Sequence, residues 1–403
     1  MKKFIQGLTR RRIWLGVTAL CSLLLGLVIS GIGSNMAAGL ETQDMAARWS
    51  EKGDVSQISC FFSREADITE ERILSFEHQL DKALLEASIV SESENANARL
   101  WASSYSATGK VRIENNRSSV EVSAVGIGGD FFLFHPLKLV SGAYFSGNDV
   151  LTDYVVIDED AAWQLFGSND VAGQMVTIGG VPHMITGVVE RESGRLAEAA
   201  GLTSSVAYVS YNSLENYGTS YGLNTYELVM PNPVSGYAKK YVAENIGVDG
   251  IEVEIVENST RFELLPRLKL LLEFGTRSMS SKAIIYPYWE NIARGYEDIL
   301  ALMTVFMILL FLYPAVLAVI AVVIAWKHKT WTVKSVYLII RDKMERFWEK
   351  QREKKKQKKL KETEPGKKEP KEKKIREKKS GRKKSEREKI VREKEEEKDE
   401  KVE

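Results

Sequence analysis

Cysteine is scarce in this 403-residue chain, which contains only Cys21 and Cys60. Cys21 lies inside a long apolar run and Cys60 in the polar middle, so we expect the two thiols in different phases and predict no internal disulfide. None of the four histidines belongs to an H-E-x-x-H pattern or a cysteine–histidine cluster, so a catalytic zinc is not expected. No Walker phosphate loop is present, so we expect neither ATP hydrolysis by this chain nor a bound cofactor.

The formal net charge is only +1, but the charges are unevenly distributed, and two short regions contain no acidic residue. The first twelve residues carry five basic groups and no acidic group, and residues 327–340 carry three basic groups and none that is acidic. Residues 13–326 carry 20 basic and 37 acidic groups, and residues 341–403 carry 28 basic and 18 acidic groups. A basic start, an acidic middle and a basic end indicate three different environments.

Two long runs, Ile13–Gly33 and Ile299–Trp326, contain no charged residue at all. Each reaches the roughly 20 residues that cross about 30 Å of hydrocarbon. Basic residues precede the first run and follow the second, which predicts that both termini are cytoplasmic. A cleaved signal peptide is the alternative for the first run, but its usual apolar core has only about 7–15 residues. A buried helix of a soluble protein is the alternative for the second, whose extra length we expect tilt or a kink at Pro314 to absorb.

The residues between the two runs show mixed helical and strand-like patterns without strict alternation, which predicts an α+β domain. Helices are expected at 70–87, 159–166, 237–246 and 262–274, and strands at 55–64, 100–105, 119–125, 154–158, 175–178, 183–189, 206–210, 225–230 and 251–256. Gly126, Gly128 and Gly129 predict a turn, and Gly179-Gly180 predicts the turn of a hairpin.

A G-x-S-x-G pattern occurs at Gly218–Gly222, around Ser220. A nucleophile elbow of this type needs a strand before it and a helix after it. Residues 212–222 instead predict a polar loop that leads into a strand. The pattern therefore does not favour a hydrolase.

The predicted organisation has six parts. They are a basic cytoplasmic N-terminus (1–12), a transmembrane helix (13–33), an extracytoplasmic domain with a juxtamembrane stalk (34–298), a second transmembrane helix (299–326), a cytoplasmic amphipathic segment (327–350) and a charged low-complexity tail (351–403). The tail has too few apolar residues to bury a core, so we expect it to be disordered or a lone charged helix. Acidic residues interleave with its lysines, which favours a solvated tail over nucleic-acid binding.

Two helical segments keep alternative explanations. Residues 262–274 are rich in leucine and basic residues, and they predict either a helix on the membrane surface, a stalk helix or an ordinary packed helix. The segment after the second apolar run predicts a helix that lies on the inner leaflet, contacts an ATPase or simply continues into water. The candidate contact residues there are Trp326, Trp331, Lys334, Tyr337 and Arg341.

Residues 129–191 carry an ordered series of short motifs: Gly129-Asp130-Phe131-Phe132, then LVSGAYF at 139–145, VVIDE at 155–159 with LFG at 165–167, GQMV at 173–176 and ITGVV at 185–189. In this order and spacing they resemble the MacB-like extracytoplasmic core domain of MacB/FtsX-type ABC transporter permeases. The resemblance implies that the matching residues, here called the signature positions, form a scaffold and not a catalytic site. They are Gly142, Phe145, Asp158, Glu159, Ala162, Leu165, Phe166, Gly167, Gly173 and Gly187.

The resemblance implies an α+β domain of MacB-like core type outside a cell membrane, an ABC-type ATPase partner inside, and a second permease chain. The sequence departs from the family plan, because the usual permease has four spans and only two are predicted here. We therefore expect a non-catalytic permease-like subunit that couples an ATPase to the outer domain for export or envelope work. The alternative is a membrane-anchored accessory or ligand-binding protein without a transport role.

Overall fold

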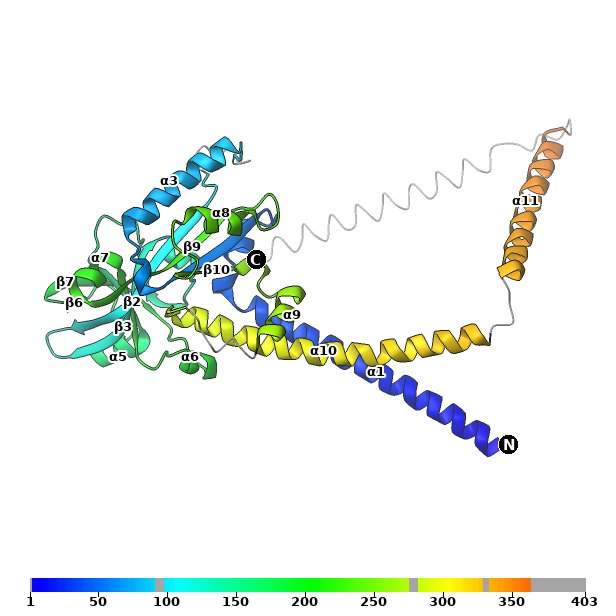
Figure 1. The fold of residues 1–403 in the computed structure, drawn as a ribbon, viewed down its shortest axis with the longest axis horizontal. Helices are drawn as coiled ribbons and strands as arrows, with labels where there is room; N and C mark the ends of the chain where they lie inside the picture. The colour runs from blue at the N-terminus through cyan, green and yellow to red at the C-terminus, as the bar shows by residue number, and fades with distance from the viewer. Residues whose placement is uncertain (1, 91–97, 275–281, 329–332, 364–403) are drawn as a thin grey trace, which may run out of the picture. The chain divides into compact units, whose positions relative to one another are not determined.

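The computed structural model describes residues 2–90, 98–274, 282–328 and 333–363 (Figure 1). The chain divides into two units, Met1–Ile320 and Ala321–Glu403. The helices are α1 (Lys2–Ala38), η1 (Glu41–Gln43), α2 (Met45–Trp49), η2 (Arg64–Ala66), α3 (Glu70–Glu86), α4 (Phe131–Phe134), α5 (Glu159–Phe166), α6 (Arg195–Ala199), α7 (Tyr211–Tyr217), α8 (Tyr237–Asn245), η3 (Asn258–Thr260), α9 (Leu264–Glu273), α10 (Tyr288–Lys327) and α11 (Val333–Thr363). The strands are β1 (Val55–Phe62), β2 (Ala102–Glu114), β3 (Ser119–Gly129), β4 (Leu139–Gly142), β5 (Tyr154–Asp158), β6 (Met175–Ile178), β7 (Val181–Val189), β8 (Val206–Ser210), β9 (Thr219–Pro231) and β10 (Val253–Glu257).

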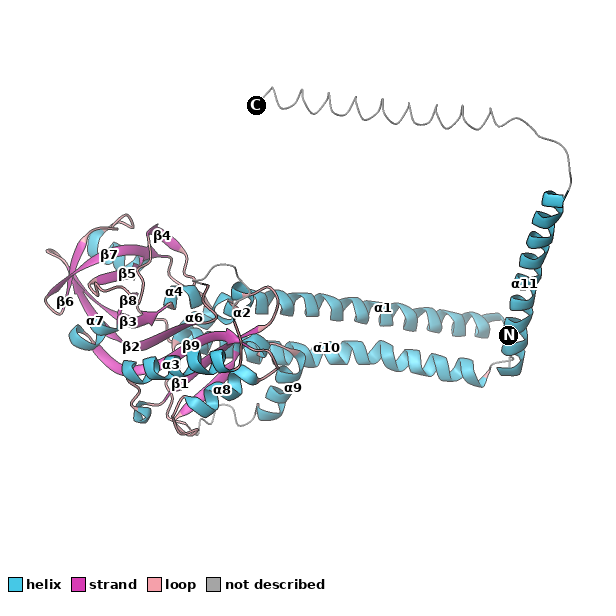
Figure 2. Cartoon of the chain, turned by 90° about the horizontal axis from the view of Figure 1, so that it is seen from above, coloured by secondary structure: helices cyan, strands magenta, loops and turns pink. Residues whose placement is uncertain are grey.

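The ten strands of the described residues belong to one sheet, in which nine follow the order β10-β1-β9-β2-β3-β8-β5-β7-β4. The strand β6 pairs with both β2 and β7, so that β2, β3, β8, β5, β7 and β6 close into a ring. The long strand β2 belongs to both parts, because it pairs with β3 and β6 of this ring and with β9 of the open sheet of β10, β1 and β9. The expected α+β class is confirmed, and Figure 2 shows helices lying against both parts of the sheet.

One hydrophobic core extends through both parts of the sheet. Phe76, Leu80 and Leu84 of α3 pack on Ile58 and Tyr226 of the open sheet. The same cluster continues into the ring with residues of β5, β6 and β7, which are Val155, Ile157, Val176, Ile178, Ile185 and Val188. One packed core therefore connects the two parts of the sheet in the domain between the apolar helices, residues 34–298, which we call the outer domain.

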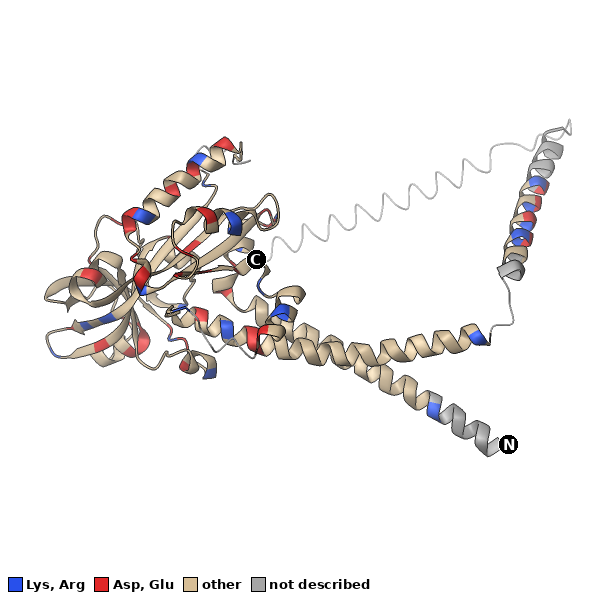
Figure 3. Ribbon diagram, viewed as in Figure 1, with Lys and Arg blue, Asp and Glu red and all other residues tan. Residues whose placement is uncertain are grey.

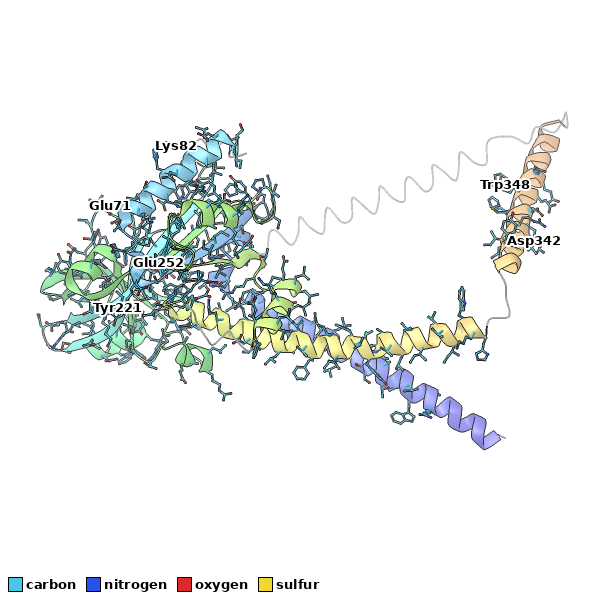
Figure 4. The ribbon with its side chains drawn as sticks, viewed as in Figure 1. Glu71, Lys82, Tyr221, Glu252, Asp342 and Trp348 are labelled. Carbon is cyan, nitrogen blue, oxygen red and sulfur yellow. The ribbon has the colours of Figure 1, made fainter. Side chains whose placement is uncertain are left out.

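Within the described residues, two helical stretches are long and apolar enough to cross a membrane, Ile13–Ala38 of α1 and the whole of α10, Tyr288–Lys327. Almost none of either apolar stretch is buried, whereas the core helix of a soluble protein would be covered (Figure 4). In Figure 3 both helices run for most of their length beyond the domain without charged side chains. The helix α10 begins eleven residues before the charge-free run and continues without interruption through Pro314.

The two long helices contact each other directly. The hydroxyl of Thr18 lies 2.8 Å from that of Tyr313, and the hydroxyl of Ser22 donates to the carbonyl of Leu310 at 2.7 Å. A Cβ atom on Gly26 would lie 3.0 Å from the ring of Phe311, so a glycine allows this close approach. The helices α1 and α10 therefore form an antiparallel pair.

Two predictions about local structure are wrong. Gly126 and Gly128 lie inside β3 and do not form a turn. A Cβ atom on Gly126 would lie 2.8 Å from Leu214, and one on Gly128 would overlap the ring of Tyr105. These glycines serve close packing in a strand, which a local pattern cannot distinguish from a turn.

The polar loop predicted at 212–222 is also wrong. Its first half is the helix α7, which Ser210 caps by accepting a hydrogen bond from the amide of Ser213. Its second half begins β9, so Ser220 lies in a strand that follows a helix and its hydroxyl donates to Glu215. This order is the reverse of a nucleophile elbow.

Candidate functional site: the joint between the apolar helices and the outer domain

Arg261 lies at the base of the outer domain, directly after η3. Its guanidinium donates to both carboxylate oxygens of Glu290 at 2.7 Å each, and its Nε donates to Glu297 at 2.6 Å. A fourth hydrogen bond of 2.9 Å goes to the side chain of Gln43. Arg294 completes the group, which we call the base joint, by donating to Glu290 at 2.9 Å.

The base joint connects three parts of the chain that are distant in sequence. Glu290, Arg294 and Glu297 lie at spacings i, i+4 and i+7 on α10, which places them on one helical face. Gln43 is the last residue of η1 and lies five residues after the end of α1 at Ala38. The group therefore fastens α10 and the segment after α1 to the turn that follows β10 and carries Arg261.

The electrostatics of the base joint are balanced, because two arginines face two glutamates. The side chain of Glu290 is fully buried and that of Arg261 is 4% exposed. Burial lowers the pKa of Arg261, but the carboxylates of Glu290 and Glu297 together raise it by more than burial lowers it. The pKa of Arg261 therefore lies above its ordinary value. A buried charge without its partner is strongly unfavourable, so each member depends on the others.

Gln57 of β1 adds a second fastening beside the base joint. Its side-chain oxygen accepts from the amide of Met45 at 2.8 Å, and its side-chain nitrogen donates to the carbonyl of Thr42 at 2.8 Å. Its backbone amide donates to the hydroxyl of Ser259 at 2.9 Å. The segment that follows α1 is thus hydrogen-bonded into the central sheet.

A buried polar network continues from this position into the domain. His135, directly after α4, hydrogen-bonds to Glu227 of β9, and Glu227 accepts from Ser59 at 3.0 Å. Asn258 of η3 donates to Ser59 at 2.7 Å. The ring of Trp289 on α10 packs 4.6 Å from that of His135, between centroids.

Apolar contacts complete the seating of α10. Trp289 and Ile292 are buried in one cluster with Leu40, Phe131 and Tyr208. The hydroxyls of Tyr208 and Tyr288 lie 2.7 Å apart. The first turns of α10 are therefore part of the domain core. Within the described part of the chain, no group of three or more His, Cys, Asp or Glu residues could hold a metal ion.

Most of the signature positions lie on or beside β4, β5, α5 and β7, and Phe145 shares a buried cluster with Trp289 of α10. Asp158 ends β5 and caps α5 by accepting from the amide of Ala161, and it also accepts from the amide of Val206, both at 2.8 Å. Burial raises the pKa of its carboxyl group. Glu159 accepts from the amide of Arg191 at 3.3 Å.

The remaining signature positions shape turns or fill the core. Ala162, Leu165 and Phe145 are buried, and Phe166 packs at the edge of the core. Gly142, Gly167 and Gly173 have positive φ, and Gly167 caps the C-terminus of α5. Gly187 of β7 pairs with Gly142 of β4.

The candidate contact residues after the second apolar run are exposed where their side chains are described. Trp326 is in the last turns of α10, and Tyr337 and Arg341 lie on α11. Arg341 pairs with Glu345 at 3.5 Å. Lys334 lies at the start of α11, and Trp331 lies outside the described residues. In Figure 4, Asp342 and Trp348 project from the same helix.

A cleft of about 690 Å³ opens between α3 and the strands β2 and β3. Five carboxylates line this α3 cleft against one arginine: Glu70, Glu77, Asp81, Asp130, Asp149 and Arg99. Trp101, Tyr105 and Tyr211 add aromatic surface. Glu77 accepts from Ser103 at 2.5 Å and from Tyr226 at 3.2 Å, and burial raises the pKa of its carboxyl group.

The base joint was not predicted from the sequence. In the sequence, Glu290 and Glu297 are recognisable only as acidic residues before an apolar run, and no local pattern indicates a role for Arg261. The available signal is the alternation of charge at Glu290, Arg294 and Glu297 on one helical face, which indicates a buried or paired face. The partner Arg261 lies 29 residues before Glu290 and has no local signal.

A model of the MacB-like periplasmic core domain matches residues 13–240, more than half of the chain. The chain belongs to the MacB-like periplasmic core domain family. The suspected family is thereby confirmed, and the match covers the first apolar helix and most of the outer domain.

Curated relatives of this MacB-like chain match over shorter segments. The macrolide export ATP-binding/permease protein MacB 2 of Aeromonas hydrophila subsp. hydrophila is 38% identical over 90 residues, which is 22% of this chain and 14% of that protein. The MacB protein of Chromobacterium violaceum is 35% identical over 86 residues, which is 21% of this chain and 13% of that protein. The matched segments thus span about one seventh of the length of these relatives.

Two solved structures resemble the MacB-like domain. The match with the periplasmic region of MacB from Actinobacillus actinomycetemcomitans covers 54% of this chain and 92% of the MacB region, with 18% identity and a TM-score of 0.35. The extracellular domain of the noncanonic ABC-type transporter YknZ from Gram-positive bacteria covers 50% and 99%, with 19% identity and a TM-score of 0.33. The family match and the two uncovered apolar helices together identify a membrane protein with an extracytoplasmic domain.

Proposed function

We propose that this chain is a permease-like membrane subunit of an ABC transporter. It couples an ATPase on the cytoplasmic side to its MacB-like domain on the other side, for export or envelope work. The observation that carries the proposal is the base joint, in which buried ion pairs and hydrogen bonds fasten both apolar helices to one packed domain.

The base joint makes the helices and the outer domain one mechanical unit. A displacement of α10 relative to the domain has to separate Glu290 from Arg261, and breaking a buried pair of this kind costs about 3–5 kcal/mol. Movement of the helices within the membrane is therefore passed to the outer domain in preference to being absorbed at its base.

The proposed partners are an ABC-type ATPase and a second permease chain. The curated relatives are named ATP-binding/permease proteins, whereas this sequence has no Walker phosphate loop. The proposal therefore needs an ABC-type ATPase as a separate subunit and a second permease chain. The exposed residues Trp326, Tyr337 and Arg341 are the candidate contacts with that ATPase or with the inner leaflet, and both termini are cytoplasmic under the same proposal.

Co-purification tests the proposed function. The tagged protein is extracted from its own membrane in several mild detergents, and the proteins that accompany it are identified by mass spectrometry. The expected result is enrichment of an ABC-type ATPase over a control purification of an unrelated two-span protein. Recovery of intact protein without any ABC component in all detergents would contradict the proposal.

The α3 cleft favours a second candidate function, a membrane-anchored accessory protein that binds a ligand. Its excess of carboxylates and its aromatic residues suit an organic cation. Deletion of the outer domain distinguishes the two functions. The subunit proposal expects loss of ATPase stimulation by the cargo or of export, whereas the accessory proposal expects both to continue unchanged.

A further inference from the structure

The helix α9 exposes three of its leucine side chains, and its other three leucines are half-buried. Leu265 and Leu272 are 75% and 88% exposed, Leu264 is half exposed, and none of the ten residues of α9 is buried. Residues 264, 265, 268 and 272 are all leucine and share one face at 3.6 residues per turn. A helix of a water-soluble domain normally has the opposite orientation, so this face is suited to an apolar partner.

The base joint fixes the position of α9 along the second apolar helix. Arg261, three residues before α9, donates to Glu297 at 2.6 Å, and the charge-free run of α10 begins two residues later at Ile299. The start of α9 is therefore held at the level where α10 becomes suited to hydrocarbon. In Figure 2, α9 lies beside α10 at the base of the outer domain.

Charged residues flank the leucine face of α9 and do not interrupt it. The side chain of Lys269 is 79% exposed and lies 3.9 Å from Glu273, one turn further along the helix. An apolar face bordered by a lysine is typical of helices that lie in the interface of a bilayer, where the aliphatic stem of the lysine reaches back to the headgroups.

We propose that α9 lies in the interface of the outer leaflet, with its leucine face in lipid. The bilayer is the occupant that the geometry favours, because Arg261 attaches the start of α9 to Glu297, two residues before the charge-free run of α10. The helix then acts as a third membrane contact that sets the height of the outer domain above the bilayer. This inference uses the two-span arrangement and does not depend on the ATPase.

Spin labelling of the full-length protein in lipid nanodiscs tests this proposal. A nitroxide is attached to Leu272→Cys and, separately, to Leu265→Cys on the same face, in a Cys21→Ala background. The Cys60 side chain is fully buried, so that residue stays unlabelled. The matched control is Leu85→Cys, a 72% exposed leucine near the end of α3.

The measurement is the accessibility of each nitroxide to oxygen, which concentrates in lipid, and to a water-soluble nickel chelate. The expected ratio of oxygen to nickel accessibility at 265 and 272 is roughly threefold higher than at 85. A ratio equal to that of the control places α9 in water and overturns the proposal. Low accessibility to both reagents identifies a protein surface, from a second copy or another subunit, and overturns it equally. The distribution of the labelled proteins on size-exclusion chromatography confirms that each variant is folded.

Discussion

Arg261 and Glu290 face each other through two hydrogen bonds of 2.7 Å, at a position where the carboxylate has no exposure to solvent. The pair joins the end of the central sheet to the first turn of α10, and Gln43 adds the segment that follows α1. Because these groups come from three distant parts of the chain, the pair forms only when the domain and both helices are assembled.

Removing the arginine leaves a buried carboxylate with a weaker partner. We expect Arg261→Met to lower the free energy of unfolding of the outer domain by about 3–5 kcal/mol, measured by urea unfolding of the full-length protein in detergent. The double variant Arg261→Met/Glu290→Met removes both charges, so we expect it to be more stable than Arg261→Met alone. Arg294→Met, which breaks a partly exposed pair, is the control and is expected to cost about 1 kcal/mol. Equal losses for Arg261→Met and Arg294→Met would contradict a special role for the buried pair.

Two separate features require glycine at the signature position Gly142: its backbone conformation and the lack of space for a side chain. Its φ is +75°, and an added Cβ atom would overlap the carbonyl of Thr186 and lie 2.9 Å from Ala172. Gly167 has a similar φ of +70° but open space around it. We expect Gly142→Ala to destabilise the protein by about 1–3 kcal/mol more than Gly167→Ala, because only the first adds overlap to backbone strain.

The same urea unfolding measurement checks this pair of variants. The backbone strain is common to both substitutions, so the difference between them isolates the packing at the β4–β7 pair. Indistinguishable free energies of unfolding would show that β4 can move away from β7 at no cost.

We expect the half-buried carboxyl group of Glu77 to make the stability of the folded protein depend on pH. Burial raises the pKa of its carboxyl group, so the folded protein retains this proton to a higher pH than the unfolded chain, whose glutamates titrate near about 4.3. The stability that follows from the protonated group is present at low pH and is lost as the pH rises through the folded pKa. We expect the wild-type protein to lose stability relative to Glu77→Gln over that range.

Thermal unfolding at a series of pH values from about 4 to 7 measures this difference. Glu86→Gln removes an exposed carboxylate from the same helix and controls for the change in net charge. A gain in the stability of wild-type protein over Glu77→Gln with rising pH would contradict the assigned direction.

The sequence predicted the parts of the fold that depend on local signals. The strand β5, the helix α5 and the hairpin of β6 and β7 were predicted within two residues, because Asp158, Gly167 and Gly179-Gly180 mark their ends by capping and turning. The two apolar helices were predicted from their lack of charge. In each of these cases the deciding residues are neighbours in the chain.

The features that the sequence did not predict depend on distant partners. Gly126 and Gly128 occur in a strand because Leu214 and Tyr105 pack against them, and neither neighbour is close in sequence. The helix α7 has only Leu214 between its two terminal tyrosines as an apolar residue, so its pattern resembles a loop. The base joint needs Arg261 and Glu290 together, and only the tertiary structure brings them into contact.

Cysteine labelling in spheroplasts tests most directly whether the two apolar helices hold the MacB-like domain outside the cell with both ends inside. A membrane-impermeant maleimide is applied to Leu85→Cys and Tyr337→Cys variants in the Cys21→Ala background. Both residues are exposed leucine or tyrosine side chains on helices, so access depends on the compartment. We predict that position 85 is labelled at once, and that position 337 is labelled only after the membrane is permeabilised. Labelling of position 337 in sealed spheroplasts, or protection of position 85, would contradict the account.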